Sequence, residues 1–127
     1  MHAKNLLTVA ATLFALALPM TGAQAHVDHG KPQFGGVVAE AGEAQFEIVS
    51  ADGKITVHAS NHGAPVATDG ASGKLTILAG AEKREVLLKA AGANRLTGEG
   101  TYSAGAKLLL QVQWPGKAPL QARVVVR

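Results

Sequence analysis

AQFEIVSADGKITVHAS, residues 44–60, is the stretch of sequence that decides the fold of this chain. Apolar and polar residues alternate on both sides of Asp52-Gly53, and Asp-Gly between two alternating runs is typical of a β-hairpin with a two-residue loop. A slip of one residue would turn every apolar side chain outward, so the pattern supports one register. The cross-strand pairs that this register predicts are Ala51 with Lys54, Ile48 with Val57, and Phe46 with Ala59.

The opposite face of the same hairpin places Glu47 across from His58. A carboxylate in this position can orient an imidazole, as the partners of metal-bound histidines do. The alternative is an exposed cross-strand pair that contributes a few tenths of a kcal/mol. His62 follows in the next turn, and the two histidines need not converge on one point.

Short alternating segments separated by turn residues continue through the rest of the chain. Turn signals recur about every eight to twelve residues, and no amphipathic helix pattern is found after residue 25. The sequence therefore predicts an all-β fold, an antiparallel immunoglobulin-like β-sandwich of seven to eight short strands, with a small closed barrel as the alternative. The strands expected besides the hairpin are 37–40, 64–67, 74–79, 85–90, 95–99, 107–113 and 120–126. The residues expected to face the core of these later strands are Leu75, Ile77, Ala79, Val86, Leu88, Leu108, Leu110, Val112, Leu120, Ala122, Val124 and Val126.

Residues 1–25 have the layout of a secretory signal peptide. Lys4 precedes an uncharged apolar run at residues 6–18, Pro19 ends that run, and AQA at 23–25 is a small-x-small cleavage site. The run is too short for a bilayer core of roughly 30 Å, although a retained membrane anchor is the alternative. We therefore expect a cleaved signal helix of the Sec type, a periplasmic location, and no membrane span after cleavage. The three expected parts are a signal peptide at 1–25, a polar histidine-containing arm at 26–34, and a β-sandwich domain at 35–127.

Composition narrows the classes of partner. The formal net charge is +3 and the charged residues are interspersed, with no basic stripe along the sequence, so nucleic acid is not an expected partner. The few aromatic residues argue against a stacking site for bases or sugars. The chain has no cysteine, which excludes disulfides and a lipoprotein anchor. The oligomeric state is left open.

The amino terminus of the processed protein is the most specific candidate for a metal-binding site. Cleavage after Ala25 would expose His26, whose α-amine and imidazole can together chelate a cation. Asp28 and His29 could complete a set of nitrogen and oxygen donors suited to Cu(II) or Ni(II). Cleavage after Ala23 would put His26 third, where the amine, two amide nitrogens and the imidazole can surround Cu(II). The alternative is a solvated arm without a ligand role. The candidate metal ligands of the whole chain are His26, Asp28, His29, Glu47, His58 and His62.

The sequence argues against Cu(I) binding, a cysteine-type zinc site, a phosphate-binding loop and catalysis. Both methionines leave with the signal peptide, so no sulfur ligand remains for Cu(I), and a zinc site of the cysteine type is excluded. Gly73-Lys74 is followed by Leu75, where a phosphate-binding loop needs Ser or Thr. No nucleophile with a base and an orienting group can be recognised, and we therefore expect a protein that is not an enzyme.

Several segments together carry a resemblance to a known group of proteins. They are GGVVAE at 35–40, QFEIV at 45–49, NHGAPV at 61–66, GASGKLT at 70–76 and GAEK at 80–83. The chain resembles small periplasmic β-sandwich proteins of Gram-negative bacteria that accompany heavy-metal efflux systems of the resistance–nodulation–division type. It is also similar to a domain of the periplasmic adaptors of those pumps. The resemblance implies a β-sandwich with a histidine-bearing arm and a role in metal handling.

Two functions are consistent with these observations. The first is a periplasmic accessory protein that holds or passes a divalent cation, Cu(II), Zn(II) or similar, in metal efflux or resistance. The alternative is a non-catalytic interaction module that docks on an efflux adaptor or another envelope protein by adding an edge strand.

Overall fold

Nine β-strands make up the regular structure of the part of the chain that the computed structural model describes, residues 30–127. The predicted signal peptide and the candidate ligands His26, Asp28 and His29 lie outside the described residues. Within 30–127 no helix is long and apolar enough to cross a membrane. The strands are β1 (Val37–Ala41), β2 (Ala44–Ala51), β3 (Lys54–Asn61), β4 (Ala64–Pro65), β5 (Ser72–Ala79), β6 (Glu82–Ala90), β7 (Arg95–Glu99), β8 (Lys107–Gln113) and β9 (Leu120–Val125).

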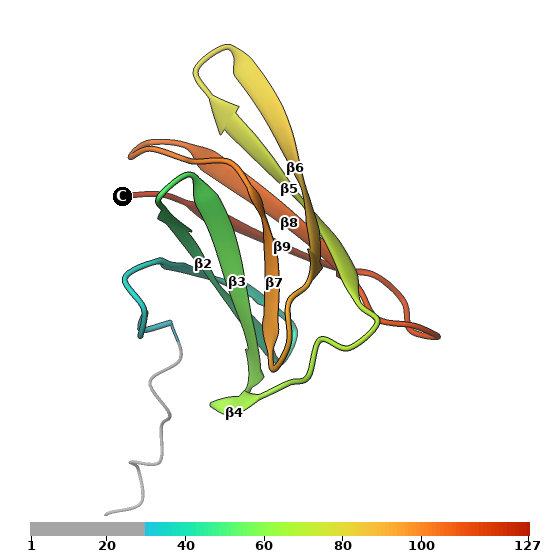
Figure 1. Cartoon of the computed structure of the whole chain (residues 1–127). Coiled ribbons are helices and arrows are strands. Elements are labelled where there is room, and N and C mark those ends of the chain that lie inside the picture. The colour runs from blue at the N-terminus through green and yellow to red at the C-terminus, as the bar shows by residue number, and fades with distance from the viewer. Residues whose placement is uncertain (1–29) are drawn as a thin grey trace, which may run out of the picture.

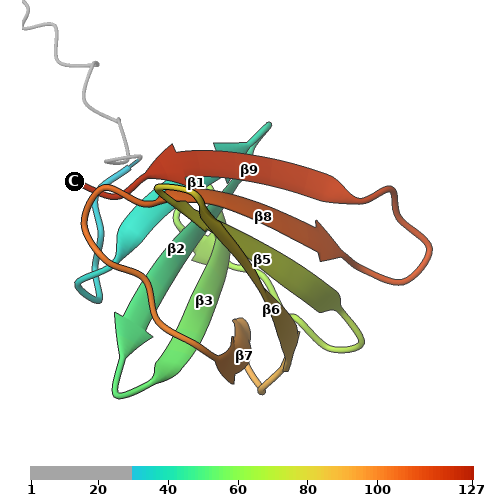
Figure 2. The same ribbon diagram turned by 90° about the horizontal axis from the view of Figure 1, so that it is seen from above.

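The strands form one antiparallel sheet in the order β1-β2-β3-β7-β6-β5-β8-β9, with β4 paired to the end of β3. The sheet curls around its core until β1 lies beside β9 (Figures 1 and 2). The predicted all-β antiparallel class is confirmed. The immunoglobulin-like sandwich has two separate sheets, whereas here a single, nearly barrel-like sheet is found, because β7 pairs with both β3 and β6 and so joins the two halves.

The β2–β3 hairpin has the predicted register throughout. Ala51 pairs with Lys54, Ile48 with Val57, Phe46 with Ala59, and Glu47 with His58. Both loop residues have positive φ, 54° at Asp52 and 75° at Gly53, which is the backbone conformation that a two-residue hairpin loop with Asp-Gly adopts. The turn therefore sets which residues of both strands face inward.

The core lies inside the curled sheet. Phe46, Ile48 and Val57 from the hairpin are at most 1 % exposed, and so are Leu75 and Ile77 from β5. Val86 and Leu88 from β6 are also buried, and so are Leu108, Leu110 and Val112 from β8, as their alternation predicts. Ala79, Leu120 and Val124 are only partly buried and pack at the edge of this cluster.

The close approach of β6 and β7 requires a glycine. A Cβ atom on Gly98 would lie 2.3 Å from the backbone oxygen of Leu87 and 2.9 Å from a methyl carbon of Val86. Only two residue pairs connect these strands, Lys89 with Thr97 and Ala90 with Leu96. Gly98 thus lies next to the short junction that joins the two halves of the sheet.

Replacing Gly98 by alanine tests this junction. We expect Gly98→Ala to lower the free energy of unfolding by about 1–3 kcal/mol, because the new methyl group meets backbone that must move. Thr97→Ala, its neighbour on β7, is the control and should cost about 1 kcal/mol or less. Urea denaturation measures both, and equal stabilities of the two variants would contradict this role of Gly98.

Candidate functional site

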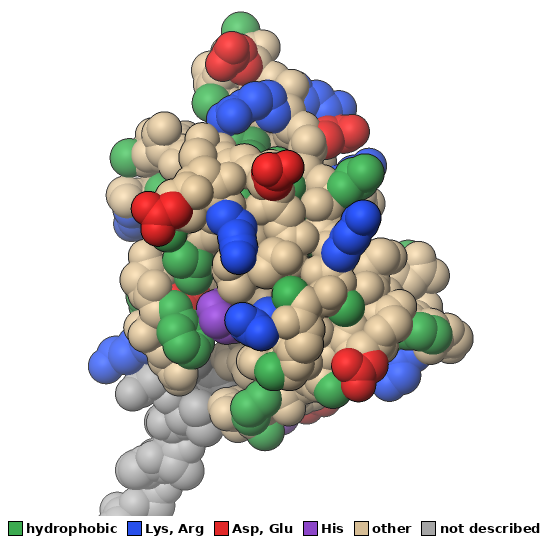
Figure 3. Space-filling model, in the orientation of Figure 1, with side chains coloured by type: hydrophobic (Ala, Val, Ile, Leu, Met, Phe, Trp, Pro, Cys, Tyr) green, Lys and Arg blue, Asp and Glu red, His purple; other side chains and the backbone are tan. Residues whose placement is uncertain are grey.

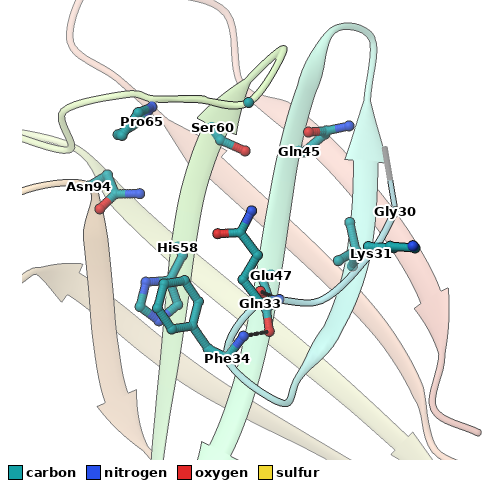
Figure 4. A pocket seen from close by; sticks show the side chains of 12 residues that line it. Gly30, Lys31, Gln33, Phe34, Gln45, Glu47, His58, Ser60, Pro65 and Asn94 are labelled. Atoms are coloured by element: carbon teal, nitrogen blue, oxygen red, sulfur yellow. Dashed lines mark hydrogen bonds between the residues drawn. The ribbon is translucent and has the colours of Figure 1, made fainter. Parts of the chain in front are cut away.

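A buried carboxylate lies on the outer face of β2. Glu47 is only 6 % exposed, although its side chain points away from the core. Its Oε1 accepts a hydrogen bond from the backbone N–H of Gln33 at 2.7 Å, and its Oε2 accepts from Phe34 at 2.8 Å and from Gly36 at 2.9 Å. Figure 4 shows the chain before β1 passing over this side chain. We call these three N–H groups and the carboxylate the Glu47 clasp.

Two glycines explain how three amides reach one carboxylate. Gly35 has a φ of 82°, a left-handed conformation that glycine adopts without strain. A Cβ on Gly36 would lie 2.3 Å from the backbone oxygen of Ile48, so the chain touches β2 here. Successive N–H groups around a left-handed residue form a concave set of donors that suits an anion. Charge-assisted bonds of this kind compensate for the burial of the carboxylate.

An aromatic stack adjoins the clasp. The rings of Phe34 and His58 are stacked, with centroids 3.9 Å apart and an angle of 14° between the planes (Figure 4). Burial lowers the pKa of His58 below its ordinary value of 6.5; the negative charge of Glu47 raises it, and the neighbouring Arg95 lowers it. The effect of burial is the largest of the three, so the pKa is lowered overall. Burial therefore favours the neutral form of the imidazole.

A second aromatic residue ties a distant loop to β2. Tyr102 donates its hydroxyl hydrogen to the backbone oxygen of Ile48 at 2.7 Å, and its backbone N–H donates to Ser50 Oγ at 3.3 Å. Burial raises the pKa of Tyr102, and the negative charge of Glu47 raises it further. The phenol therefore stays protonated and keeps the hydrogen bond to the strand that carries the clasp.

A hollow of about 190 Å³ lies between the docked chain, β2 and β3. Its titratable lining residues are Lys31, Glu47 and His58. Asn94, in the same hollow, donates a hydrogen of its side-chain amide to the backbone oxygen of Ala59 at 2.8 Å. Among the described residues, no hydrogen bond to the ring of His58 is found. The face of the molecule in Figure 3 carries side chains of both charge signs. The residues that line the hollow are Gly30, Lys31, Gln33, Phe34, Val38, Gln45, Glu47, His58, Ser60, Gly63, Pro65 and Asn94.

The structure brings together only part of the predicted ligand set. Glu47 and His58 are neighbours, as predicted, but both carboxylate oxygens of Glu47 are already used by the clasp. His62 lies in the turn after β3 with a φ of 52°, and its Nε2 is 2.9 Å from Oε1 of Glu43. Within residues 30–127, no group of three or more His, Asp or Glu side chains is placed to hold a metal ion.

Two expectations about the arm and the Glu47–His58 pair are corrected. The sequence predicted a polar arm at 26–34 separate from the β-domain, and an exposed Glu47–His58 pair as the alternative to an oriented imidazole. In the described part of the arm, Gln33 and Phe34 are instead bound to the sheet and cover that pair. The polar composition of the arm hid this contact, because the donors are backbone amides that carry no sequence signal. The consecutive glycines at 35 and 36, directly after the aromatic Phe34, were the signal that could have indicated it.

Comparisons with protein-family models, with curated proteins and with solved structures find no significant match to this chain.

The clasp is tested by removing its carboxylate. Glu47→Ala should lower the free energy of unfolding by about 2–4 kcal/mol, since three amides lose a charged acceptor. Amide hydrogen exchange at Gln33, Phe34 and Gly36 should become faster. Glu43→Ala is the matched control, because its contact with His62 is solvent-exposed and should be worth about 0.5 kcal/mol or less. Unchanged exchange at these three amides in Glu47→Ala would contradict the clasp.

The stack with Phe34 makes a separate prediction for His58. In an NMR titration its imidazole pKa should lie below 6.5 and move up toward that value in Phe34→Ala, because the ring regains water. Since the unfolded chain binds this proton more readily, the contribution of neutral His58 to stability is complete above pH 6.5. It is lost as the pH falls through the folded-state pKa. A pKa unchanged by Phe34→Ala would show that the stack does not shield the ring.

Proposed function

We propose that the processed protein is a periplasmic, non-enzymatic protein that binds a divalent cation, Cu(II) or Zn(II), through donors at its amino terminus. It holds or passes this ion in metal efflux or resistance, with the periplasmic adaptor of an efflux pump as its partner. The secretory layout of residues 1–25 and the resemblance described above support the location and the partner. The donors are His26, Asp28 and His29, with His58 as a further imidazole.

The observation that carries this proposal is the Glu47 clasp. It binds the chain at Gln33, Phe34 and Gly36, only a few residues after the histidines of the arm. His29 directly precedes Gly30 in the sequence, and Gly30 lines the same hollow as His58. The clasp thus binds the first described residues to a surface that carries the His58 imidazole, and burial favours the neutral form of this imidazole, which is the form that ligates metals.

The clasp assigns different roles to the candidate ligands on the sheet. Glu47 is a positioning residue, because its oxygens are occupied by backbone amides. His58 keeps its ring nitrogens without a hydrogen-bond partner among the described residues and is the imidazole suited to join the donors of the arm. His62 lies in the turn after β3, where its Nε2 contacts Oε1 of Glu43 on the solvent-exposed surface.

Calorimetric titration of the processed protein tests metal binding. We expect one Cu(II) ion to bind with a Kd below ~10 μM at neutral pH, which corresponds to about 7 kcal/mol. His26→Ala should weaken the affinity at least about tenfold by removing the chelating side chain. Gln33→Ala is the control, because it changes an arm side chain but keeps the backbone amide of the clasp.

Mass spectrometry of the mature amino terminus must accompany this titration, since it establishes which donors the processed protein retains. A mature chain that begins after His29, or a cupric spectrum identical to that of the free ion, would overturn the proposal. Equal affinities of His26→Ala and Gln33→Ala would also contradict it.

A further inference from the structure

Four strands that are not all neighbours in sequence present one outer face. The register places Lys83 of β6, Leu78 of β5, Lys107 of β8 and Val125 of β9 in a single row across the sheet. The next row is Glu85, Thr76, Leu109 and Arg123. Their neighbours along the strands, such as Ile77 and Leu108, are buried in the core, so both rows point outward. We call these two rows the basic face.

The charge of this face is strongly one-sided. Its one carboxylate, Glu85, lies 3.6 Å from Lys74 of β5 and is balanced by it. Lys83, Lys107 and Arg123 form no ion pair with the described residues. Three cations therefore remain uncompensated within two adjacent rows of one sheet.

Apolar side chains lie between these cations. Leu78 is 40 % exposed and Val125 is 50 % exposed. Together with Leu109 they line a hollow of about 490 Å³ whose charged lining residues are Lys107 and Arg123. An apolar hollow with a charged rim is the arrangement found at protein-binding sites, where an anchor side chain enters the hollow and the rim selects the charge of the partner.

We propose that the basic face is a docking site for an acidic protein segment that carries an aliphatic anchor residue. The anchor occupies the hollow beside Leu78, Leu109 and Val125, and carboxylates on either side of it pair with Lys107 and Arg123. The positive rim selects an anionic partner, and the concave apolar centre favours a protein segment over a bilayer, since a bilayer receives side chains that protrude. This surface lies on a different half of the sheet from the Glu47 clasp.

A synthetic peptide tests the proposal without knowledge of the natural partner. The probe is a fluorescent octapeptide in which four glutamates surround two leucines. In one comparison peptide serine replaces leucine, and in the other glutamine replaces glutamate. Binding is followed by fluorescence anisotropy at low salt. We expect the parent peptide to bind most tightly and both substituted peptides to bind at least about tenfold more weakly. The serine peptide lacks the aliphatic anchor, and the glutamine peptide lacks the carboxylates that pair with Lys107 and Arg123.

Variants of the protein separate this face from general electrostatic attraction. Lys107→Glu/Arg123→Glu should weaken peptide binding about tenfold or more, and Leu109→Ser should weaken it without any change in charge. Lys54→Glu/Lys117→Glu has the same net charge as the first variant. It changes the β2–β3 turn and the far end of the β8–β9 hairpin, so it should weaken binding less than about twofold. Thermal unfolding confirms that each variant is folded.

Two results would overturn the proposal. One is an equal loss of peptide binding in both double variants, which would show attraction by net charge alone. The other is binding to vesicles of anionic phosphatidylglycerol that is lost in Lys107→Glu/Arg123→Glu while the peptide does not bind, which would identify the face as a membrane contact.

Discussion

The register of the β2–β3 hairpin is the constraint on which the rest of this structure depends. Asp52 and Gly53 close the turn, and side chains alternate strictly between the two faces from that point onward. One face gives the core Phe46, Ile48 and their partners. The other face holds Glu47 and His58 side by side. A slip of one residue would turn Glu47 and His58 into the core and turn Phe46 and Ile48 outward. The same turn therefore determines both the stability of the domain and the position of the candidate site.

The Glu47 clasp converts a polar stretch of chain into part of the folded domain. Residues just before a first strand are often loose, because they bury little apolar surface. Here a single carboxylate supplies the attraction, since its two oxygens accept three backbone hydrogen bonds and Phe34 covers the neighbouring imidazole. The arrangement is strong but local, and it involves few residues. The position of the docked segment thus depends strongly on one side chain, that of Glu47.

The two halves of the curled sheet present different surfaces. The half made of β1, β2, β3 and β7 carries the clasp, the half-buried imidazole and a small polar hollow. The half made of β5, β6, β8 and β9 carries uncompensated cations around exposed aliphatic side chains. The short β6–β7 junction, with its close approach at Gly98, connects them. The two halves of one small domain therefore present chemically distinct surfaces.

The sequence by itself determined the hairpin, its register and most of the inward-facing residues, because alternation and turn chemistry act between residues that are close along the chain. It also predicted that Glu47 would lie opposite His58. Only the tertiary structure decided that Gln33, Phe34 and Gly36 bind Glu47. The donors are backbone N–H groups, which nearly every residue has, so the sequence does not indicate which of them will bind. Likewise, Lys83, Lys107 and Arg123 are interspersed along the chain, and only the strand order brings them onto one face. The order of strands depends on contacts between distant segments, such as β7 with β3 and β6, and this is why a sandwich was expected where a single curled sheet formed.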